Sequence, residues 1–196
     1  MIPGGQLSSI TIPAGIIGGR GANISGTLDY EYGGIGLSDV SEGKMYQIWE
    51  GKLLGDDITL SSPTTVPEVI YSASDMTEFS FTFDQNMRPT ISFVQDGIAK
   101  YRWYDSTVTD YVVSTIPGNV RTPKVFLDDK RVAQDSSSDI ILAYIKLGAA
   151  SKDLYYRLQR DRYGVEYLLK EGCGGVLHKF GMNKKLRLQF VIFSDR

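Results

Sequence analysis

The fold is decided by Phe79-Ser-Phe-Thr-Phe-Asp84, followed by Thr90-Ile-Ser-Phe-Val-Gln-Asp-Gly97 and Lys100-Tyr-Arg-Trp-Tyr104. An apolar run is followed in turn by an Asp-led turn, a run with alternating apolar residues, a glycine turn and an aromatic-basic run. Alternation with a period of two, rich in aromatic and β-branched residues and bounded by turn residues, predicts β-strands. The stretch therefore predicts antiparallel strands joined by short turns.

The same pattern occurs a second time, at Val125-Phe-Leu-Asp128, Ile140-Ile-Leu-Ala-Tyr-Ile145 and Asp153-Leu-Tyr-Tyr-Arg157. Asp84 and Asp128 stand about 44 residues apart, and such a period is typical of repeat architectures. Four-stranded blades of about 40–45 residues build β-propellers. We expect an all-β fold of antiparallel β-repeat units, arranged either as propeller-like blades or as a duplicated β-sandwich.

The repeat divides the chain into two parts. A β-repeat domain is expected over residues 37–196, with units at about 37–75, 79–116, 123–170 and 176–193. Residues 1–36 are expected to form an extended arm, because closely spaced glycines prevent a stable helix. The arm carries isoleucines that are costly to leave in water. It therefore lies either on its own domain or, as we favour, on a neighbouring subunit through Ile10, Ile12, Ile16 and Ile17.

Composition excludes several classes of protein. A formal net charge of −2 argues against a nucleic-acid partner, because proteins that bind nucleic acids normally carry an excess of positive charge. No run of 18 or more apolar residues and no signal-like N-terminus occurs, so no membrane partner and synthesis in the cytoplasm are expected. The single cysteine permits no intrachain disulfide, so stability is expected from packing or assembly.

Tyrosine and arginine gather in Leu154-Tyr-Tyr-Arg-Leu-Gln-Arg-Asp-Arg-Tyr163, and the first repeat carries an aromatic-basic strand at the matching position. Two interpretations stand side by side. Tyr and Arg are enriched at protein interfaces, and in that interpretation Asp161 pairs with a flanking arginine. Alternatively, stacked rings and forked guanidiniums grip a carboxylated sugar. The candidates for either role are Trp103, Tyr155, Tyr156, Arg157, Arg160 and Arg162.

Catalytic and metal-binding patterns are missing from the sequence. Any Ser-His-Asp or Cys-His catalyst would need His178, which follows Cys173 without a nucleophile-elbow pattern. One His and one Cys do not supply the four ligands of a structural zinc site. We therefore expect a protein that is not an enzyme, with no catalytic residues, no metal and no cofactor.

Three segments resemble virion structural proteins of tailed bacteriophages, in particular the repetitive β-domains of tail components. They are Phe83-Asp-Gln-Asn-Met-Arg-Pro89 with Tyr101-Arg-Trp-Tyr-Asp105, Leu154–Tyr167, and Gly181-Met-Asn-Lys-Lys-Leu-Arg-Leu-Gln-Phe190, within a resemblance that covers about residues 35–193. The resemblance implies a part in a symmetric assembly without catalysis, whose partners are copies of itself and other virion tail proteins. It also implies location in the virion, after synthesis and assembly in the host cytoplasm.

Two other functions stay open at this point. The chain could be a carbohydrate-binding module that recognises host surface glycans through the Tyr, Arg and Trp strands. The third and weakest hypothesis is a propeller-type glycan hydrolase, which would need two carboxyl groups at set separations.

Overall fold

The structure is a computed structural model that describes residues 29–31, 49–62, 65–84, 88–128, 139–182 and 188–194. The arm residues Ile10, Ile12, Ile16 and Ile17 lie outside the described residues, so their predicted interface role stays a prediction.

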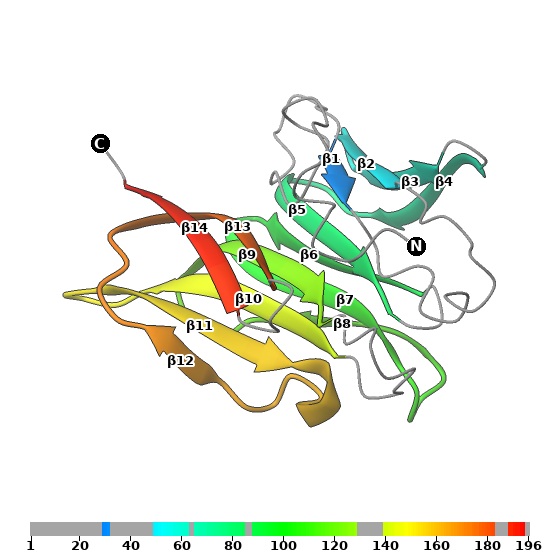
Figure 1. Ribbon diagram of the computed structural model, residues 1–196. Coiled ribbons are helices and arrows are strands. Elements are labelled where there is room, and N and C mark those ends of the chain that lie inside the picture. Colours follow the sequence, from blue (N-terminus) through cyan, green and yellow to red (C-terminus); the bar gives the residue numbers. More distant parts are fainter. Residues whose placement is uncertain are drawn as a thin grey trace, which may run out of the picture.

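Four antiparallel sheets account for nearly all of the described residues, and this confirms the predicted all-β class (Figure 1). The first sheet has the order β1 (Asp29–Glu31), β2 (Trp49–Leu54), β3 (Asp57–Ser62), β4 (Thr65–Ser72). The second has the order β5 (Met76–Phe83), β6 (Pro89–Gln95), β7 (Ile98–Asp105), β8 (Asp110–Thr115). The third has the order β12 (Tyr167–Lys170), β11 (Lys152–Leu158), β10 (Ile140–Leu147), β9 (Val120–Leu127). The fourth pairs β13 (Gly175–Met182) with β14 (Leu188–Ser194).

Consecutive strands pair with their neighbours in sequence, so each sheet is a meander built from one stretch of chain. The sheets span residues 29–72, 76–115, 120–170 and 175–194. The units expected from the sequence are 37–75, 79–116, 123–170 and 176–193, so the bounds of the last three units differ from these by three residues or fewer. One difference lies at the start, where β1 falls within the predicted arm. Its Glu31 pairs with Trp49 of β2, so this part of the arm returns to its own domain.

The second sheet is covered on both faces. Phe79, Phe81 and Phe83 of β5 point toward the first sheet, and the residues between them point toward the third. Successive side chains of a strand alternate between the two faces of a sheet. In the Phe79–Phe83 part of β5, the side chains on both faces are buried. Ser80 is 1 % exposed, and its Oγ accepts a hydrogen bond from the backbone N–H of Val125 at 3.2 Å. Polar residues on this inner face thus bond to the backbone of the neighbouring sheet.

Three apolar cores separate the four sheets. The core between the first and second sheets contains Leu53, Ile58 and Leu60 against the phenylalanines of β5 and β6. The second core packs residues such as Trp103 of β7 against Tyr144 of β10. The third core packs Ala143, Ile145 and Leu154 of the third sheet against β13 and β14. Each interior sheet therefore contributes to two cores.

The sheets form an open stack. Neighbouring sheets meet through the first strand of each, since β9 packs against β5 and β13 packs against β9. Figure 1 shows the first sheet (cyan) and the fourth sheet (orange to red) on either side of the other two. No closed propeller forms within the part of the chain that is described, and adjacent sheets pack face to face.

A single helical turn, the 3₁₀ helix η3 (Gln159–Asp161), interrupts the third sheet between β11 and β12. No helix among the described residues has the length and apolar character required to span a membrane.

Candidate ligand pocket and interface residues

A pocket of about 440 Å³, lined by polar and apolar atoms in about equal measure, lies at one end of the second and third sheets. Its walls come from the end of β7 and the turn after it, from η3 and the residue that follows, and from single residues before β6 and β10. The lining residues are Arg88, Trp103, Tyr104, Asp105, Ser106, Thr107, Asp139, Gln159, Arg160 and Arg162.

The three arginines of the pocket each pair with a buried aspartate. Arg162 donates from Nη2 to Oδ2 of Asp105, which lies 57 positions earlier in the chain. Arg160 pairs through Nε with Oδ2 of Asp139 at 3.3 Å, and its backbone N–H donates to Oδ1 at 2.8 Å. A charged hydrogen bond that is partly buried holds both groups in a set geometry. The buried carboxylates therefore fix where the guanidinium groups stand.

Arg88 follows the same rule within one hairpin. Its Nε donates to Oδ2 of Asp84 at 2.7 Å, and its backbone N–H donates to Oδ1 at 2.9 Å. The guanidinium carbon also lies 4.0 Å from the centre of the Tyr104 ring. Guanidinium groups interact favourably with aromatic faces at such distances. The face of Tyr104 is thus occupied by Arg88.

The two pocket aspartates have opposite pKa shifts. The Thr107 hydroxyl donates to Oδ1 of Asp105 at 2.7 Å, and this bond together with Arg162 holds the pKa of Asp105 below its ordinary value. Burial raises the pKa of Asp139, and the backbone N–H and charge of Arg160 offset part of that rise. Asp105 is therefore ionised down to lower pH than Asp139.

A strained turn holds Arg162 at the pocket. Arg162 and Tyr163 adopt φ values of 51° and 56°, a left-handed region in which bulky residues are rare. Such conformations cost about 1–3 kcal/mol each and persist only where surrounding contacts enforce them. Arg157 enforces this one, because its Nη1 donates to the carbonyl oxygen of Tyr163 at 2.6 Å.

The Tyr163 side chain anchors the turn in the core. It is 1 % exposed and meets the rings of Tyr101 and Trp103 edge-on, with ring centres 4.8 and 5.2 Å away. Burial raises the pKa of Tyr163 well above its ordinary value. Trp103 is 6 % exposed, and neither its indole Nε1 nor the Tyr163 hydroxyl has a hydrogen-bond partner in the structure's described part. Trp103 is therefore a core residue whose side chain borders the pocket.

Arg157 belongs to a separate network inside the third sheet. Its Nε donates to the Tyr144 hydroxyl at 2.7 Å, and that hydroxyl donates to Oε1 of Glu166 at 2.5 Å. Lys146 donates to the other oxygen of Glu166 at 2.7 Å. Burial alone would raise the pKa of Glu166, but the hydrogen bonds from Lys146, Tyr144 and Arg157 outweigh it and lower the pKa. Arg157 thus ties the segment after η3 to β10.

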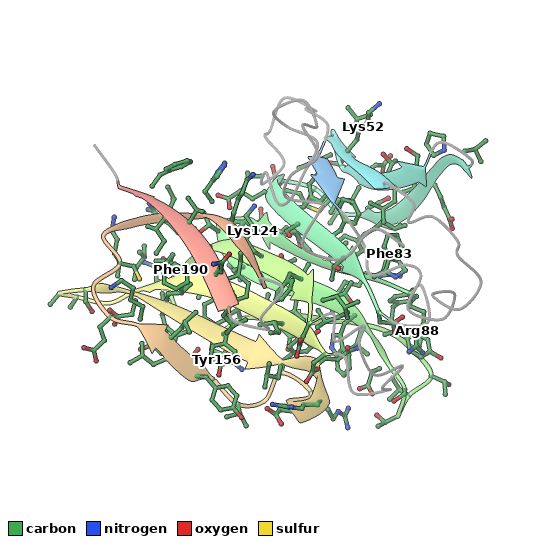
Figure 2. All side chains as sticks on the ribbon, in the orientation of Figure 1. Lys52, Phe83, Arg88, Lys124, Tyr156 and Phe190 are labelled. Carbon is green, nitrogen blue, oxygen red and sulfur yellow. The ribbon has the colours of Figure 1, made fainter. Side chains whose placement is uncertain are left out.

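Tyr155 and Tyr156 lie on opposite faces of β11. Tyr155 stacks on Tyr144 with ring centres 6.4 Å apart, on the face that packs toward the second sheet. Tyr156 stacks on Tyr167 at 5.0 Å and borders the core beneath the fourth sheet. Figure 2 shows Tyr156 and Arg88 at well separated places on the molecule. The two tyrosines therefore do not form one platform.

The structure divides the six candidate residues into two groups. Trp103, Arg160 and Arg162 line one pocket, whereas Tyr155, Tyr156 and Arg157 stabilise the third sheet. The expected pairing of Asp161 with a flanking arginine does not occur, because Arg160 and Arg162 pair with aspartates of other segments. Asp161 instead accepts a hydrogen bond from the Tyr167 hydroxyl at 2.9 Å.

Some pocket residues were not among the sequence candidates, namely Arg88, Tyr104, Asp105, Asp139 and Gln159. Arg88 carries a local signal, since it follows Asp84 by four positions across a predicted turn. No comparable signal marks Asp139, whose partner Arg160 lies 21 positions further along the chain, in η3.

The outer face of the fourth sheet exposes two large apolar side chains. Phe190 and Ile192 pack inward, whereas Val191 and Phe193 are 43 % and 53 % exposed. The His178 ring lies 4.5 Å from the Phe193 ring. Among the described residues, β13 and β14 pair only with each other, so each has an outer edge without a strand partner. The first sheet also exposes Leu54, Val66 and Val69 at the other end of the stack.

Comparisons with known proteins do not assign this chain to a family. No family model, no curated protein and no solved structure matches it. Within the described residues, no group of three or more His, Cys, Asp or Glu side chains is placed to hold a metal ion.

Proposed function

We propose that this chain is a non-enzymatic structural component of a tailed-phage virion, placed in the tail as part of a ring, collar, baseplate or fibre attachment. It assembles with copies of itself and with other virion tail proteins. The observation that carries the assembly role is the fourth sheet, which presents two exposed large apolar side chains and two outer strand edges.

Exposed sheet edges and exposed apolar faces favour association with another chain. Full burial of a Val or Phe side chain contributes about 1.5–3 kcal/mol. Val191 and Phe193 are each about half exposed, so covering them would contribute about 1 kcal/mol apiece. A strand added at an edge brings main-chain hydrogen bonds as well. Symmetry would repeat each of these modest contacts around an assembly.

The virion assignment is supported by the resemblance of residues 83–89, 101–105, 154–167 and 181–190 to tail components. Each of these four segments includes residues of described strands, and the segment 154–167 also includes η3 and the pocket residues Arg160 and Arg162. The resemblance and the fourth sheet thus support two levels of the same proposal.

The assembly role is tested by light scattering of the purified protein over a range of concentration. We expect a defined oligomer that dissociates in the Phe193→Asp variant, because a carboxylate cannot be buried in an apolar contact without large cost. Val113→Asp is the matched control for added charge, because Val113 is similarly exposed but lies in β8 of the second sheet and not on either end sheet. A strict monomer at all concentrations, or an unchanged oligomer in Phe193→Asp, would contradict the role of the fourth sheet.

The virion assignment needs its own experiment. An antibody raised against this chain should label particles produced by the strain that carries the gene, as seen by immunogold electron microscopy. Labelling confined to one end of the particle would support a tail location. Absence of the chain from purified particles would refute the virion assignment and leave the assembly role intact.

A second candidate function is carbohydrate binding. It is favoured by the convergence of Trp103, Arg160 and Arg162 on one pocket, although they come from two different sheets. A glycan array probed with the purified chain tests this function, and binding lost in a pocket variant would support it.

A further inference from the structure

We propose that the pocket between β7 and η3 binds a carboxylate-bearing saccharide, with Arg160 and Arg162 holding the carboxylate. The proposal does not depend on the assembly role, because the pocket lies between the second and third sheets and not on the fourth.

The pocket wall is suited to a hydrophilic ligand. Small-molecule sites range from about 300 to 1,000 Å³ but are lined mainly by apolar side chains. This pocket has a volume of about 440 Å³, and only Trp103 and Tyr104 of its ten lining residues are aromatic or apolar. The remaining residues offer guanidinium, carboxylate, hydroxyl and amide groups. A ligand with many hydroxyl groups matches such a wall.

The charge of the wall selects an acidic ligand. Each of the three pocket arginines is balanced by a paired aspartate, but the aspartates are buried, so the charged groups that face a ligand are guanidiniums. Arg160 and Arg162 are 64 % and 57 % exposed, so a ligand can reach them. A guanidinium carries five N–H donors. Arg162 uses Nη2 for its hydrogen bond to Asp105, whereas the Arg160 guanidinium makes an ion pair with Asp139 without a hydrogen bond. The remaining N–H groups have no acceptor among the described residues and can bind a carboxylate in the forked geometry that Arg favours.

The arginines are held in place before any ligand arrives. Asp105 and Asp139 are 4 % and 5 % exposed and bind the two guanidiniums from below. The positive φ of Arg162 and the Arg157 contact to the next residue fix the turn itself. Groups that are already ordered lose less conformational entropy on binding.

Stacking on an aromatic platform is not the mode of recognition here. Trp103 is buried, and Arg88 covers the Tyr104 ring at 4.0 Å. A neutral sugar therefore lacks the ring face on which it would stack. Recognition depends on charged hydrogen bonds to a carboxylate, with Ser106 and Gln159 of the wall placed to bind hydroxyl groups.

Isothermal titration of the full chain tests the proposal, with trisaccharides that end in glucuronate or in sialic acid as probes. The same trisaccharides with a neutral terminal sugar are the ligand controls. We expect acidic probes to bind roughly tenfold or more tightly than neutral ones, since a hydrogen bond to a charged group is worth at least that factor. Binding should also weaken as salt is raised.

Variants locate the binding. Arg160→Gln with Arg162→Gln should lose roughly tenfold or more in affinity, whereas Arg121→Gln, an exposed arginine of β9 outside the pocket, should stay within about twofold. Circular dichroism checks the fold, and light scattering should give the wild-type mass, which separates this proposal from the assembly role. No binding of either acidic probe, equal binding of the neutral probes, or equal affinity for an acidic peptide would overturn it.

Discussion

The packing of the first sheet on the second depends on the absence of a side chain at Gly51. A Cβ atom at this position would lie 2.7 Å from Cε1 of Phe81 and 2.8 Å from Cε2 of Phe79, closer than real Cβ contacts allow. Both rings are fully buried, so they cannot move aside into solvent. Gly51→Ala should therefore push the two sheets apart or force the rings from their preferred rotamers.

The magnitude follows from two opposed terms. Overpacking a core by one methyl group costs about 1–3 kcal/mol. Replacing a strand glycine recovers about 0.5–1 kcal/mol of backbone entropy. We expect Gly51→Ala to lower the free energy of unfolding by about 0.5–2 kcal/mol. Gly181→Ala in β13 is the control, because nothing lies within 4 Å of its added Cβ, and it should be neutral or slightly stabilising.

A double-mutant cycle identifies the cause. Phe81→Leu removes the ring atoms that account for two of the three closest contacts at Gly51, at a cost below the about 3–5 kcal/mol of a full Phe→Ala truncation. The double variant should be more stable than the sum of the single effects predicts, by about 0.5–1.5 kcal/mol. Urea unfolding followed by circular dichroism measures all four proteins. Strict additivity, or a Gly51→Ala variant as stable as wild type, would refute this account of the sheet interface.

Two further predictions concern the polar groups. Asp105→Asn should destabilise the protein at neutral pH, and the difference from wild type should shrink as the pH falls below about 3.8, the ordinary pKa of an aspartate. The folded state lowers the pKa of Asp105, so the stabilisation disappears as the carboxyl group is protonated. Urea unfolding at a series of pH values measures the difference in stability, and a difference independent of pH would contradict the prediction. Tyr144→Phe should lower the free energy of unfolding by about 1–3 kcal/mol, because Arg157 and Glu166 lose the hydroxyl group that both bind. Tyr155→Phe is the control. Equal losses of stability in the two variants would contradict a stabilising role of the hydrogen-bond network.

The sequence predicts strands well because their period is local, but it does not show how many faces are covered. The alternation in Phe79-Ser-Phe-Thr-Phe83 is typical of a strand with one face exposed to solvent. In the structure Ser80 and Thr82 are each 1 % exposed, because the third sheet covers the face that they occupy. Such burial becomes acceptable only through bonds from β9, such as that between Val125 and Ser80. The partner lies 45 positions away, beyond the reach of a local pattern.

The candidate site shows the same limit more strongly. Composition indicates that Arg160 and Arg162 are unusual, but it assigns them an adjacent partner, Asp161. The structure pairs Arg160 with Asp139, directly before β10, and Arg162 with Asp105, at the end of β7. These pairings arise from the stacking of the sheets and from the left-handed turn at Arg162. Neither leaves a trace in residue spacing, so the pocket itself could not be predicted.

The open stack has a consequence for the proposed assembly. Among the described residues, the two interior sheets pack against a neighbouring sheet on both faces, whereas the first and fourth sheets do so on one face each. The outer faces of these two sheets differ, since one exposes Leu54 and Val69 and the other exposes Val191 and Phe193. A contact between unlike faces is heterologous, and it closes into a ring if the rotation per subunit divides a full turn and otherwise grows into a filament. A contact between two fourth sheets would instead stop at a dimer. The mass of the oligomer therefore distinguishes the two modes, because a dimer requires like faces, whereas a larger ring or filament requires the first sheet as well.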